Sequence, residues 1–498
     1  MIQLNAETLT ALPQDVAVPA YGLAERRVGI VHFGVGGFHR AHQALYVDRL
    51  MNAGRALDWA ICGVGLMPHD AAMRDALAAQ DNLFTLIEKA PDGTHAARVV
   101  GAIARYLYAP DNPEAVLAQL ADPAVRIVSL TVTEGGYNYN PATGEFNAHA
   151  PAVAADLAEG AVPSTTFGYI TEALRRRREA GTAPFTVMSC DNIQGNGHLA
   201  QKVFTAFARL KDAALGEWIA REVAFPNSMV DRITPVTTDA DREALAEEHG
   251  IGDRWPVVSE DYLQWVLEDR FPAGRPEWDA AGVQLVDDVE PYELMKLRLL
   301  NASHQAMAYS GYLAGHRYAH EVIEDPLLRE FLAAYMSREG APTLRPVPGI
   351  DLAAYQAKLL ERFGNRQVRD TLARLCAESS DRIPTWLVPV IRQNLSDGGS
   401  VALSAAVVAT WARYAEGVDE AGEPIQVVDR LRDRVMAAAA EQDRDPLAFV
   451  RDPELFGDLA DHEGFTRHYL AALAVLRESG VRELIERLRA SGWAGIAG

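Results

Sequence analysis

The chain has 498 residues, 49% of them hydrophobic, and a formal net charge of −21. This length corresponds to two or three domains of about 150 residues each, and the acidic balance argues against nucleic-acid binding, which usually needs a basic face. No stretch reaches the roughly 20 apolar residues of a membrane-spanning helix, and the N-terminus does not resemble a secretory signal. The three cysteines are far apart in the sequence, which is typical of a reduced, cytoplasmic protein without a cysteine-rich zinc site.

The first half of the chain alternates predicted strands and helices. After an irregular arm at 1–27, four apolar runs have the length and composition of buried parallel strands. They lie at 27–33, 59–65, 126–133 and 184–192. Helical patterns lie between them, for example at 41–51 and 168–180. This alternation predicts an α/β domain with a doubly wound parallel sheet over residues 1–285.

The second half is predicted to be mainly α-helical. Helical patterns dominate, and continuous apolar strand runs become scarce. The predicted helices cover 292–314, 325–338, 351–361, 366–378 and 400–416. We therefore place a second domain at 286–498.

A glycine-rich turn, HFGVGGFHRAH (32–42), joins the first predicted strand to the first helix, which is the context that a dinucleotide fingerprint requires. Gly34 permits the tight turn, and Gly36 lets the backbone approach a pyrophosphate that the amides of the helix start would face. His39 stands in place of the third glycine of GxGxxG. A glycine-rich turn that merely packs tightly is the alternative. The predicted cofactor contacts are Gly34, Val35, Gly36, Gly37 and Phe38.

An acidic residue after the second strand is expected to hold the adenosine ribose hydroxyls. The candidate is Asp70 in GLMPHDAAM. Its charge would repel a 2′-phosphate and so favour NAD over NADP. Asp70 also suits the N-cap of a predicted helix at 71–79, and the two roles are compatible.

The stretch KLRLLNASHQ (296–305) places a lysine, an asparagine and a histidine on one predicted helix. At about 100° per residue, Asn301 lies about 140° round from Lys296 and His304 lies about 80° round. A lysine among leucines is partly desolvated, which lowers its pKa toward neutrality and suits a general base. The spacing alone favours an ordinary helix, with Lys296 reaching solvent and His304 in the core.

Two other polar clusters follow predicted apolar segments. Asn192, in CDNIQGNG (190–197), ends the fourth strand at the edge where α/β domains bind ligands, and an Asx turn is the alternative. Asp231 and Arg232 lie between apolar residues in FPNSMVDRITP (225–235), and a structural ion pair is the alternative there.

Together these stretches resemble the mannitol dehydrogenase family, the polyol-specific long-chain dehydrogenases. The matching segments occur in the family's order, and they are IVHFGVGGFHRAHQ, SLTVTEGGY, FTVMSCDN, FPNSMVDRITP, KLRLLNASH and PVPGIDL. The resemblance implies an expanded Rossmann-type N-terminal domain followed by a mostly α-helical C-terminal domain. It also implies NAD as the cofactor, with Asp70 aligned to the acidic residue associated with NAD preference.

The resemblance also assigns catalytic and substrate-binding roles. Lys296 is implied to be the general base, while Asn192 and Asn301 stabilise the substrate oxygen as it becomes charged, without a metal. The positions implied to bind polyol hydroxyls are Asp231, His304, Arg374 and Arg382. Arg382, in SSDRIPTW, stands where the family often has lysine, and its longer, forked side chain leaves its contact open.

The implied reaction interconverts a linear polyol and its ketose, with D-mannitol and D-fructose as the first candidates. The implied enzyme is cytoplasmic, and its partner is a small molecule rather than a nucleic acid or a membrane. Family members are frequently monomers. D-arabinitol or D-sorbitol dehydrogenation and fructuronate or tagaturonate reduction are alternatives within the family. Gly135 in TEGGY favours the polyol branch, because the uronate branch often reads TEKGY. A catalytically silent NAD-binding sensor is the alternative from a different class, and the intact set of Lys296, Asn301 and His304 argues against it.

Overall fold

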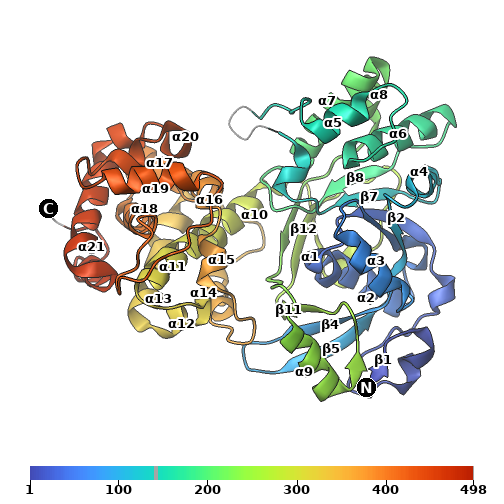
Figure 1. Cartoon of the computed structure of the whole chain (residues 1–498), viewed down its shortest axis with the longest axis horizontal. Coiled ribbons are helices and arrows are strands. Elements are labelled where there is room, and N and C mark those ends of the chain that lie inside the picture. Colours follow the sequence, from blue (N-terminus) through green and yellow to red (C-terminus); the bar gives the residue numbers. More distant parts are fainter. Residues whose placement is uncertain (140–143, 497–498) are drawn as a thin grey trace. The chain divides into compact units, whose positions relative to one another are not determined.

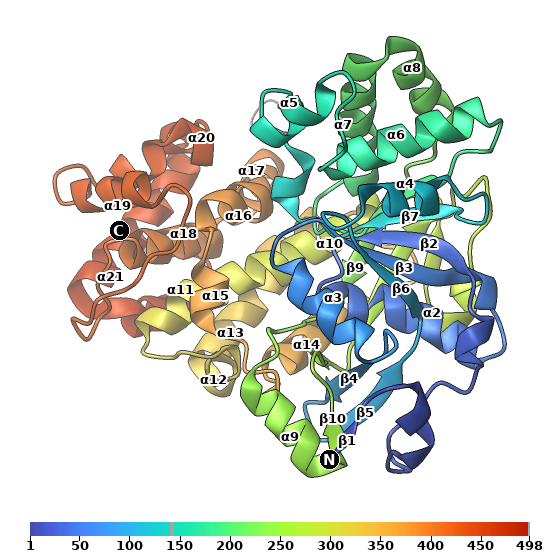
Figure 2. The same cartoon turned by 45° about the vertical axis from the view of Figure 1, so that its right-hand side comes forward.

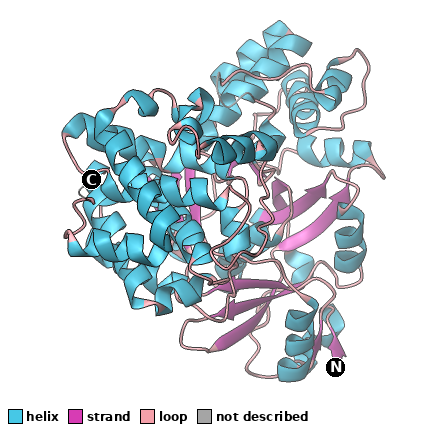
Figure 3. Cartoon of the chain, turned by 60° about the vertical axis from the view of Figure 1, so that its left-hand side comes forward, coloured by secondary structure: helices cyan, strands magenta, loops and turns pink. Residues whose placement is uncertain are grey.

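A computed structural model of the chain describes residues 1–139 and 144–496. The chain divides into two compact units, Met1–Glu290 and Pro291–Gly498 (Figure 1). The strands of the described residues all lie in the first unit, whereas helices and loops build the second (Figure 3).

A five-stranded parallel sheet forms the centre of the first unit, in the order β6-β3-β2-β7-β8. Figure 2 shows β6, β3, β2 and β7 side by side. Its strands are β2 Val28–Phe33, β3 Ala60–Gly65, β6 Ile103–Tyr108, β7 Ile127–Leu130 and β8 Thr186–Ser189. Because all five run in the same direction, the segments that follow them emerge at one edge of the sheet. This edge is where open α/β sheets bind their ligands.

Alternate side chains of these strands enter two different cores, because neighbouring residues of a strand point to opposite faces. On one face Val31, Val128 and Val187 join a core with residues of α4 (Pro113–Ala121), α6 (Thr166–Glu179) and α7 (Asn196–Lys211). On the other face Ile30, Ile127 and Met188 join a core with residues of α2 (Gln43–Asn52) and β12 (Gln264–Glu268). The sheet is therefore buried on both sides, as its continuous apolar runs predict.

Smaller sheets and further helices complete the first unit. β1 (Ile2–Gln3) pairs with β10 (Ile251–Gly252), β4 (Phe84–Lys89) lies between β11 (Val257–Glu260) and β5 (His95–Val100), and β12 lies between β9 (Ser228–Asp231) and β13 (Gln284–Val286). The other α-helices are α1 Gly37–Ala41, α3 Asp70–Ala78, α5 Pro151–Leu157, α8 Ala213–Glu222 and α9 Asp239–His249. The 3₁₀ helices are η1 Ala6–Ala11, η2 Leu23–Glu25, η3 Leu57–Trp59, η4 Glu134–Tyr137 and η5 Trp278–Ala281.

The second unit is helical and has one helix, α18, as its buried centre. α18 (Ala402–Tyr414) packs against α21 (Glu463–Ala490) and α11 (Ala302–Leu313). The buried carboxylate of Glu339 accepts hydrogen bonds from the backbone amides of Leu403 and Ser404 and so caps the start of α18.

The remaining helices of the second unit surround this centre. The α-helices are α10 Glu290–Met295, α12 Ala319–Glu324, α13 Pro326–Tyr335, α14 Leu352–Phe363, α15 Leu372–Cys376, α16 Ser379–Trp386, α17 Val388–Asp397, α19 Arg432–Glu441 and α20 Pro453–Phe456. Two π-helices, η6 Lys296–Asn301 and η7 Met336–Gly340, and three 3₁₀ helices, η8 Ala341–Thr343, η9 Ala448–Arg451 and η10 Leu459–Asp461, complete the set.

The predicted fold class is confirmed, and several predicted segments need correction. The arm at 1–27 is not irregular throughout, because it contains β1, η1 and η2. The helix expected at 41–51 starts earlier and breaks at His42, between α1 and α2. The helix expected at 366–378 is only the short α15, which begins after a left-handed residue, Arg369. The helix expected at 292–314 contains the π-helix η6.

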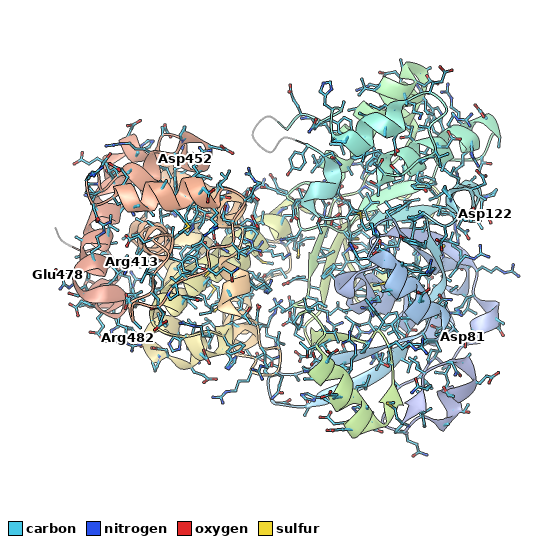
Figure 4. The ribbon with its side chains drawn as sticks, in the orientation of Figure 1. Asp81, Asp122, Arg413, Asp452, Glu478 and Arg482 are labelled. Atoms are coloured by element: carbon cyan, nitrogen blue, oxygen red, sulfur yellow. The ribbon has the colours of Figure 1, made fainter. Side chains whose placement is uncertain are left out.

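Some acidic side chains, such as those of Asp191 and Glu339, are buried, and others lie on the surface. Asp81, Asp122 and Glu478 are exposed and project away from the ribbon (Figure 4). Within the described ranges, no helix combines the length and the apolar character that crossing a bilayer requires.

Candidate active site

The glycine-rich turn follows β2 directly, at the carboxyl edge of the sheet. Gly34 has φ +87°, and a Cβ at this position would lie 2.0 Å from the carbonyl oxygen of Thr131, so the fold requires glycine here. Gly36 has φ −91°, and the nearest atom to a Cβ there would be the Gly34 oxygen at 3.9 Å. Neither backbone nor packing requires glycine at 36, and the open space beside it suits the close approach of a pyrophosphate.

His39 occupies the third fingerprint position. A glycine there would allow α1 to approach β2 closely, whereas the His39 side chain packs between them. Its ring stacks on that of His32 in β2, with 3.4 Å between ring centroids. The His32 ring nitrogens lie 2.7 Å from Ser129 Oγ and 2.9 Å from Thr131 Oγ1. Burial lowers the pKa of His32 to about 3 and that of His39 well below its usual value. Two neutral, flat rings therefore fill the interface between β2 and α1.

Asp70 lies at the same edge, after the neighbouring strand β3. It is the first residue of α3, whose N-cap is His69, so the N-cap prediction is wrong by one residue. Asp70 Oδ2 accepts a 2.8 Å hydrogen bond from the Met67 amide. A Cβ on Gly65 would lie 2.6 Å from the Asp70 Cβ, which places Asp70 against the end of β3, next to the strand that carries the glycine turn.

Asn192 and Asp231 are carried by elements that are joined to each other. Asn192 follows β8 and is exposed, and Asp231 is the buried last residue of β9. Ser228 Oγ, at the start of β9, donates to the Ser189 carbonyl at the end of β8 over 2.6 Å. The structure therefore places the start of β9 beside the end of β8.

Arg232, the residue after Asp231, forms a buried ion pair, and its partner is a residue far away in the sequence. Its guanidinium donates to Glu88 Oε1 over 2.5 Å, to the Ala41 carbonyl over 2.6 Å and to the Glu260 carbonyl over 2.7 Å. The ion pair is with Glu88 rather than with Asp231, so the structural interpretation applies to Arg232.

The segment that carries Lys296 is a π-helix rather than part of a continuous α-helix. η6 (Lys296–Asn301) lies between α10 and α11. A π-helix forms i→i+5 hydrogen bonds, so residues five apart lie above one another. Lys296 and Asn301 are five residues apart, and they therefore share one side of the segment instead of lying about 140° apart. Both side chains are buried.

His304 lies in α11 among several cationic side chains. Its pKa is well below its usual value because of burial, and because of the positive charges of Arg374, Arg362, Arg382 and Lys296. The ring is therefore neutral, and the structure brings Lys296, His304, Arg374 and Arg382 into one neighbourhood of the second unit.

Two buried polar atoms in this neighbourhood have no hydrogen-bond partner among the described residues. They are Asn301 Nδ2, which is a donor, and His304 Nε2, whose role depends on the tautomer of the ring. Buried polar atoms of proteins are nearly always paired. The two unpaired atoms are therefore the expected contacts of a polar ligand.

Arg374 and Arg382 are held in place by contacts that the sequence did not reveal. Asp370 accepts two hydrogen bonds from Arg374, of 2.7 and 2.6 Å, and Arg382 Nη1 donates to the carbonyls of Arg374 and Leu375 over 3.1 and 3.0 Å. Asp370 is four residues before Arg374 but precedes the start of α15, so the i,i+4 spacing of charge pairs within a helix does not by itself predict this contact. Within the described ranges, no three His, Cys, Asp or Glu side chains are grouped to hold a metal ion.

Comparison with known proteins covers nearly the whole chain. Residues 28–280 match the mannitol dehydrogenase Rossmann domain, and residues 288–476 match the mannitol dehydrogenase C-terminal domain. The chain belongs to the mannitol dehydrogenase family. The first matched range contains the glycine turn, Asp70, Asn192 and Asp231, and the second contains the η6–α11 segment with both arginines.

Relatives within the mannitol dehydrogenase family align over almost their full length. The mannitol 2-dehydrogenase of Aspergillus fumigatus is 46% identical, over 98% of this chain and 99% of the relative. The Pseudomonas fluorescens mannitol 2-dehydrogenase, solved as a ternary complex with NAD and D-mannitol, is 46% identical with a TM-score of 0.90, over 98% of this chain and 100% of that one. A substrate-free D-sorbitol dehydrogenase is 39% identical with a TM-score of 0.89, over 97% and 100%. The family predicted from the motifs is confirmed, and the roles of individual residues stay predictions.

Proposed function

We propose that the chain is an NAD-dependent polyol dehydrogenase that interconverts D-mannitol and D-fructose. The observation that carries this proposal is the pair of buried, unpaired polar atoms on Asn301 and His304 beside Lys296, in a chain of the mannitol dehydrogenase family. The Pseudomonas relative binds NAD and D-mannitol. A hydroxyl-rich substrate both donates and accepts hydrogen bonds, so it can satisfy these buried groups.

We assign NAD binding to residues 1–285 and substrate binding to residues 286–498. The turn Gly34–Phe38 would hold the pyrophosphate, because the space beside Gly36 is open, and Asp70 would hold the adenosine ribose. NAD, when bound, supplies the hydride acceptor. The acidic charge of Asp70 disfavours the 2′-phosphate of NADP.

Lys296 is the proposed acid–base group of the reaction. In its neutral form it removes the proton of the C2 hydroxyl, and in the reverse direction its ammonium returns a proton to the carbonyl oxygen. The amides of Asn192 and Asn301 donate hydrogen bonds to that oxygen as it gains negative charge. Donors that are already in place stabilise this charge without reorganisation, so the proposed reaction needs no metal.

The remaining polar groups are proposed to bind the other hydroxyls. Arg374 and Arg382 can only donate, Asp231 accepts, and the neutral ring of His304 can do either, depending on its tautomer. Asp370 holds Arg374 by two hydrogen bonds, so this donor is oriented before the substrate arrives.

Gly135 is the residue that we connect with the choice between polyol and uronate substrates. A Cβ at this position would meet no atom within 4 Å, so packing does not require glycine there. We propose that the absence of a lysine at this position selects polyols over uronates. D-sorbitol is the second candidate polyol, because a D-sorbitol dehydrogenase is among the similar structures; D-arabinitol remains an alternative.

A spectrophotometric panel tests the proposal. NADH oxidation is followed with fructose, fructuronate, tagatose and xylulose, and NAD reduction with mannitol, sorbitol and arabinitol, before and after dialysis against a chelator. We expect fructose reduction and mannitol oxidation that survive the chelator. Turnover of fructuronate alone would identify the chain as a member of the uronate branch. No turnover of any substrate would favour a silent NAD-binding sensor.

Gly135→Lys is the matched variant for the choice of branch. We expect it to raise fructuronate reduction relative to fructose reduction while the melting temperature stays unchanged. We also propose that the enzyme is cytoplasmic and monomeric, and that it has no nucleic-acid or membrane partner. Gel filtration of the purified chain measures the oligomeric state.

A further inference from the structure

Asp191, the residue before Asn192, joins two loops at the carboxyl edge of the sheet. Its side chain is buried at the end of β8. Oδ1 accepts a 2.8 Å hydrogen bond from the Thr133 amide, and Oδ2 accepts bonds of 3.1 Å from the Val132 amide and 2.7 Å from the Tyr137 hydroxyl. One carboxylate therefore holds three donors of the loop that follows β7.

The loop held by Asp191 has a conformation that needs outside support. Thr133 has φ +62° and ψ 171°, a region that residues other than glycine rarely occupy unless their surroundings impose it. Tyr137 is buried, and its hydroxyl also lies 2.6 Å from Ser189 Oγ. Its pKa is raised well above the usual value, first by burial and then by the charge of Asp191, so the hydroxyl keeps its proton and donates.

The same loop contacts the glycine turn. Thr131 Oγ1 donates to the Gly34 carbonyl over 2.6 Å, and the next two residues, Val132 and Thr133, are the ones whose amides Asp191 holds. A continuous path of hydrogen bonds and short backbone segments thus runs from Asp191, through the loop after β7, to the turn proposed to hold NAD.

The backbone of Asp191 is also bound. Its carbonyl accepts hydrogen bonds from the Ile193 amide over 2.9 Å and from Asn196 Nδ2 over 3.0 Å. Asn196 Nδ2 also donates to the Ser228 carbonyl of β9 over 2.7 Å. The residue on the N-terminal side of Asn192 is therefore held through both its side chain and its carbonyl, although Asn192 itself is exposed.

We propose that Asp191 is a positioning residue that fixes Asn192 relative to the glycine turn, and thereby fixes the donor to the substrate oxygen relative to the cofactor. This inference rests on the proposed role of Asn192. Asp191 touches neither ligand and acts through Asn192 and the loop after β7. A misplacement of about 1 Å in an active site can cost roughly 100-fold in rate, so loss of the carboxylate is expected to lower kcat more than it raises KM.

The ionised form of Asp191 is the one that accepts all three donors. Burial raises its pKa to about 6, the hydrogen bonds from Tyr137, Thr133 and Val132 oppose this rise, and the charge of Glu134 adds to it. The titratable groups that face it are Tyr137, Glu134 and the buried thiol of Cys190. Below pH 6 the carboxyl carries a proton, and at least one of the three hydrogen bonds is lost.

The test is a double-mutant cycle of Asp191→Asn and Asn192→Ala in the full chain, read as kcat and KM for fructose reduction. We expect Asp191→Asn alone to lower kcat by roughly 10- to 100-fold, and to have less than about a threefold further effect when Asn192 is already alanine, since coupled residues are not additive. An equal loss in both backgrounds, or no loss in the single variant, would overturn the inference. If Asn192→Ala alone has no effect, the proposed function of Asn192 fails instead.

Asp156→Asn is the matched control for stability. Asp156 is buried in the same unit and accepts hydrogen bonds from Ser164 and Thr165 through their amides and hydroxyls, and none of these partners is a candidate site residue. It should lower the melting temperature and leave kcat unchanged. If it lowers kcat as much as Asp191→Asn at a similar loss of melting temperature, the effect of Asp191 is one of folding. Tyr137→Phe, which removes one donor of the three, serves if Asp191→Asn does not fold, and a kcat unchanged from wild type would then count against the inference.

The pH profile of fructose reduction separates Asp191 from Lys296. In this direction Lys296 acts as an ammonium, so its titration produces only a basic limb. We expect an acid limb in kcat near pH 6 in the wild type and none in Asp191→Asn. The same acid limb in both proteins would show that another group produces it.

Discussion

Replacing Gly34 and Gly36 by alanine, one at a time, separates the folding role of the turn from its proposed role in binding NAD. At Gly34, φ is +87° and a Cβ would lie 2.0 Å from a carbonyl oxygen of the neighbouring strand segment. At Gly36, φ is −91° and a Cβ would meet only one atom, 3.9 Å away. The two residues are two positions apart, yet only the first is required by the fold.

The expected magnitudes follow from these two environments. An alanine with positive φ costs about 1–2 kcal/mol, and relief of the clash with Thr131 adds about 1–3 kcal/mol, so Gly34→Ala should lose roughly 2–5 kcal/mol of unfolding free energy. Gly36→Ala should be neutral or gain about 0.4–1 kcal/mol, because alanine restricts the unfolded chain. A methyl group in the space proposed for the pyrophosphate costs about 1–3 kcal/mol, which raises the Kd for NAD by roughly 5- to 150-fold.

Two measurements decide the outcome. Thermal unfolding without nucleotide reports the stability of each variant, and NADH fluorescence titration reports the Kd. We expect Gly34→Ala to unfold at a lower temperature, and Gly36→Ala to unfold like the wild type while binding NADH more weakly. A Kd for Gly36→Ala within twofold of wild type would show that the pyrophosphate does not approach this residue. An unchanged melting temperature for Gly34→Ala would contradict the steric argument.

Three further changes test individual groups. Lys296→Ala should lower kcat by roughly 10²- to 10⁴-fold, the range for a positioned acid–base group, with the Kd for NADH unchanged; a loss below tenfold would mean that Lys296 is not the base. Asp70→Asn should increase kcat/KM with NADPH relative to NADH. An unchanged ratio would mean that Asp70 does not select the cofactor and has a structural role, through its hydrogen bond to the Met67 amide. Burial raises the pKa of Asp191 from 3.8 to about 6, so its charged form destabilises the fold above pH 6, and this cost disappears as the pH falls toward 3.8. Chemical unfolding should therefore show the wild type gaining roughly 1 kcal/mol relative to Asp191→Asn for the pH unit below 6. A constant difference would contradict the raised pKa.

Four of the five strands of the parallel sheet were predictable because burial on both faces leaves a clear mark. The four apolar runs predicted from the sequence contain β2, β3, β7 and β8. β6 was not found, because only Ile103 of this strand is fully buried and Arg105 is exposed. The hairpin of β4 and β5 was missed for a related reason, since polar residues such as Lys89 and His95 form the end next to its turn.

The predictable part of the site consists of residues that follow a strand end. Gly34, Asp70 and Asn192 follow β2, β3 and β8, and the parallel direction of these strands is enough to bring them to one edge. Asp191 and Asp370 were missed, because nothing in their local sequence distinguishes a buried carboxylate that orients a neighbour from one that faces solvent. Their role becomes visible only when the partners, Thr133 and Arg374, are known to lie within hydrogen-bond distance.

The π-helix η6 explains why spacing alone made KLRLLNASHQ look like an ordinary helix. An α-helix would turn Asn301 about 140° away from Lys296, whereas i→i+5 hydrogen bonding places it above Lys296. His304 follows Asn301 by three residues in α11, where residues three apart are neighbours. One inserted residue in the helix thus aligns the lysine, the amide and the imidazole on one side. If the same residues formed a continuous α-helix instead, Asn301 would lie about 140° from Lys296, and the amide donor would no longer lie beside the proposed base.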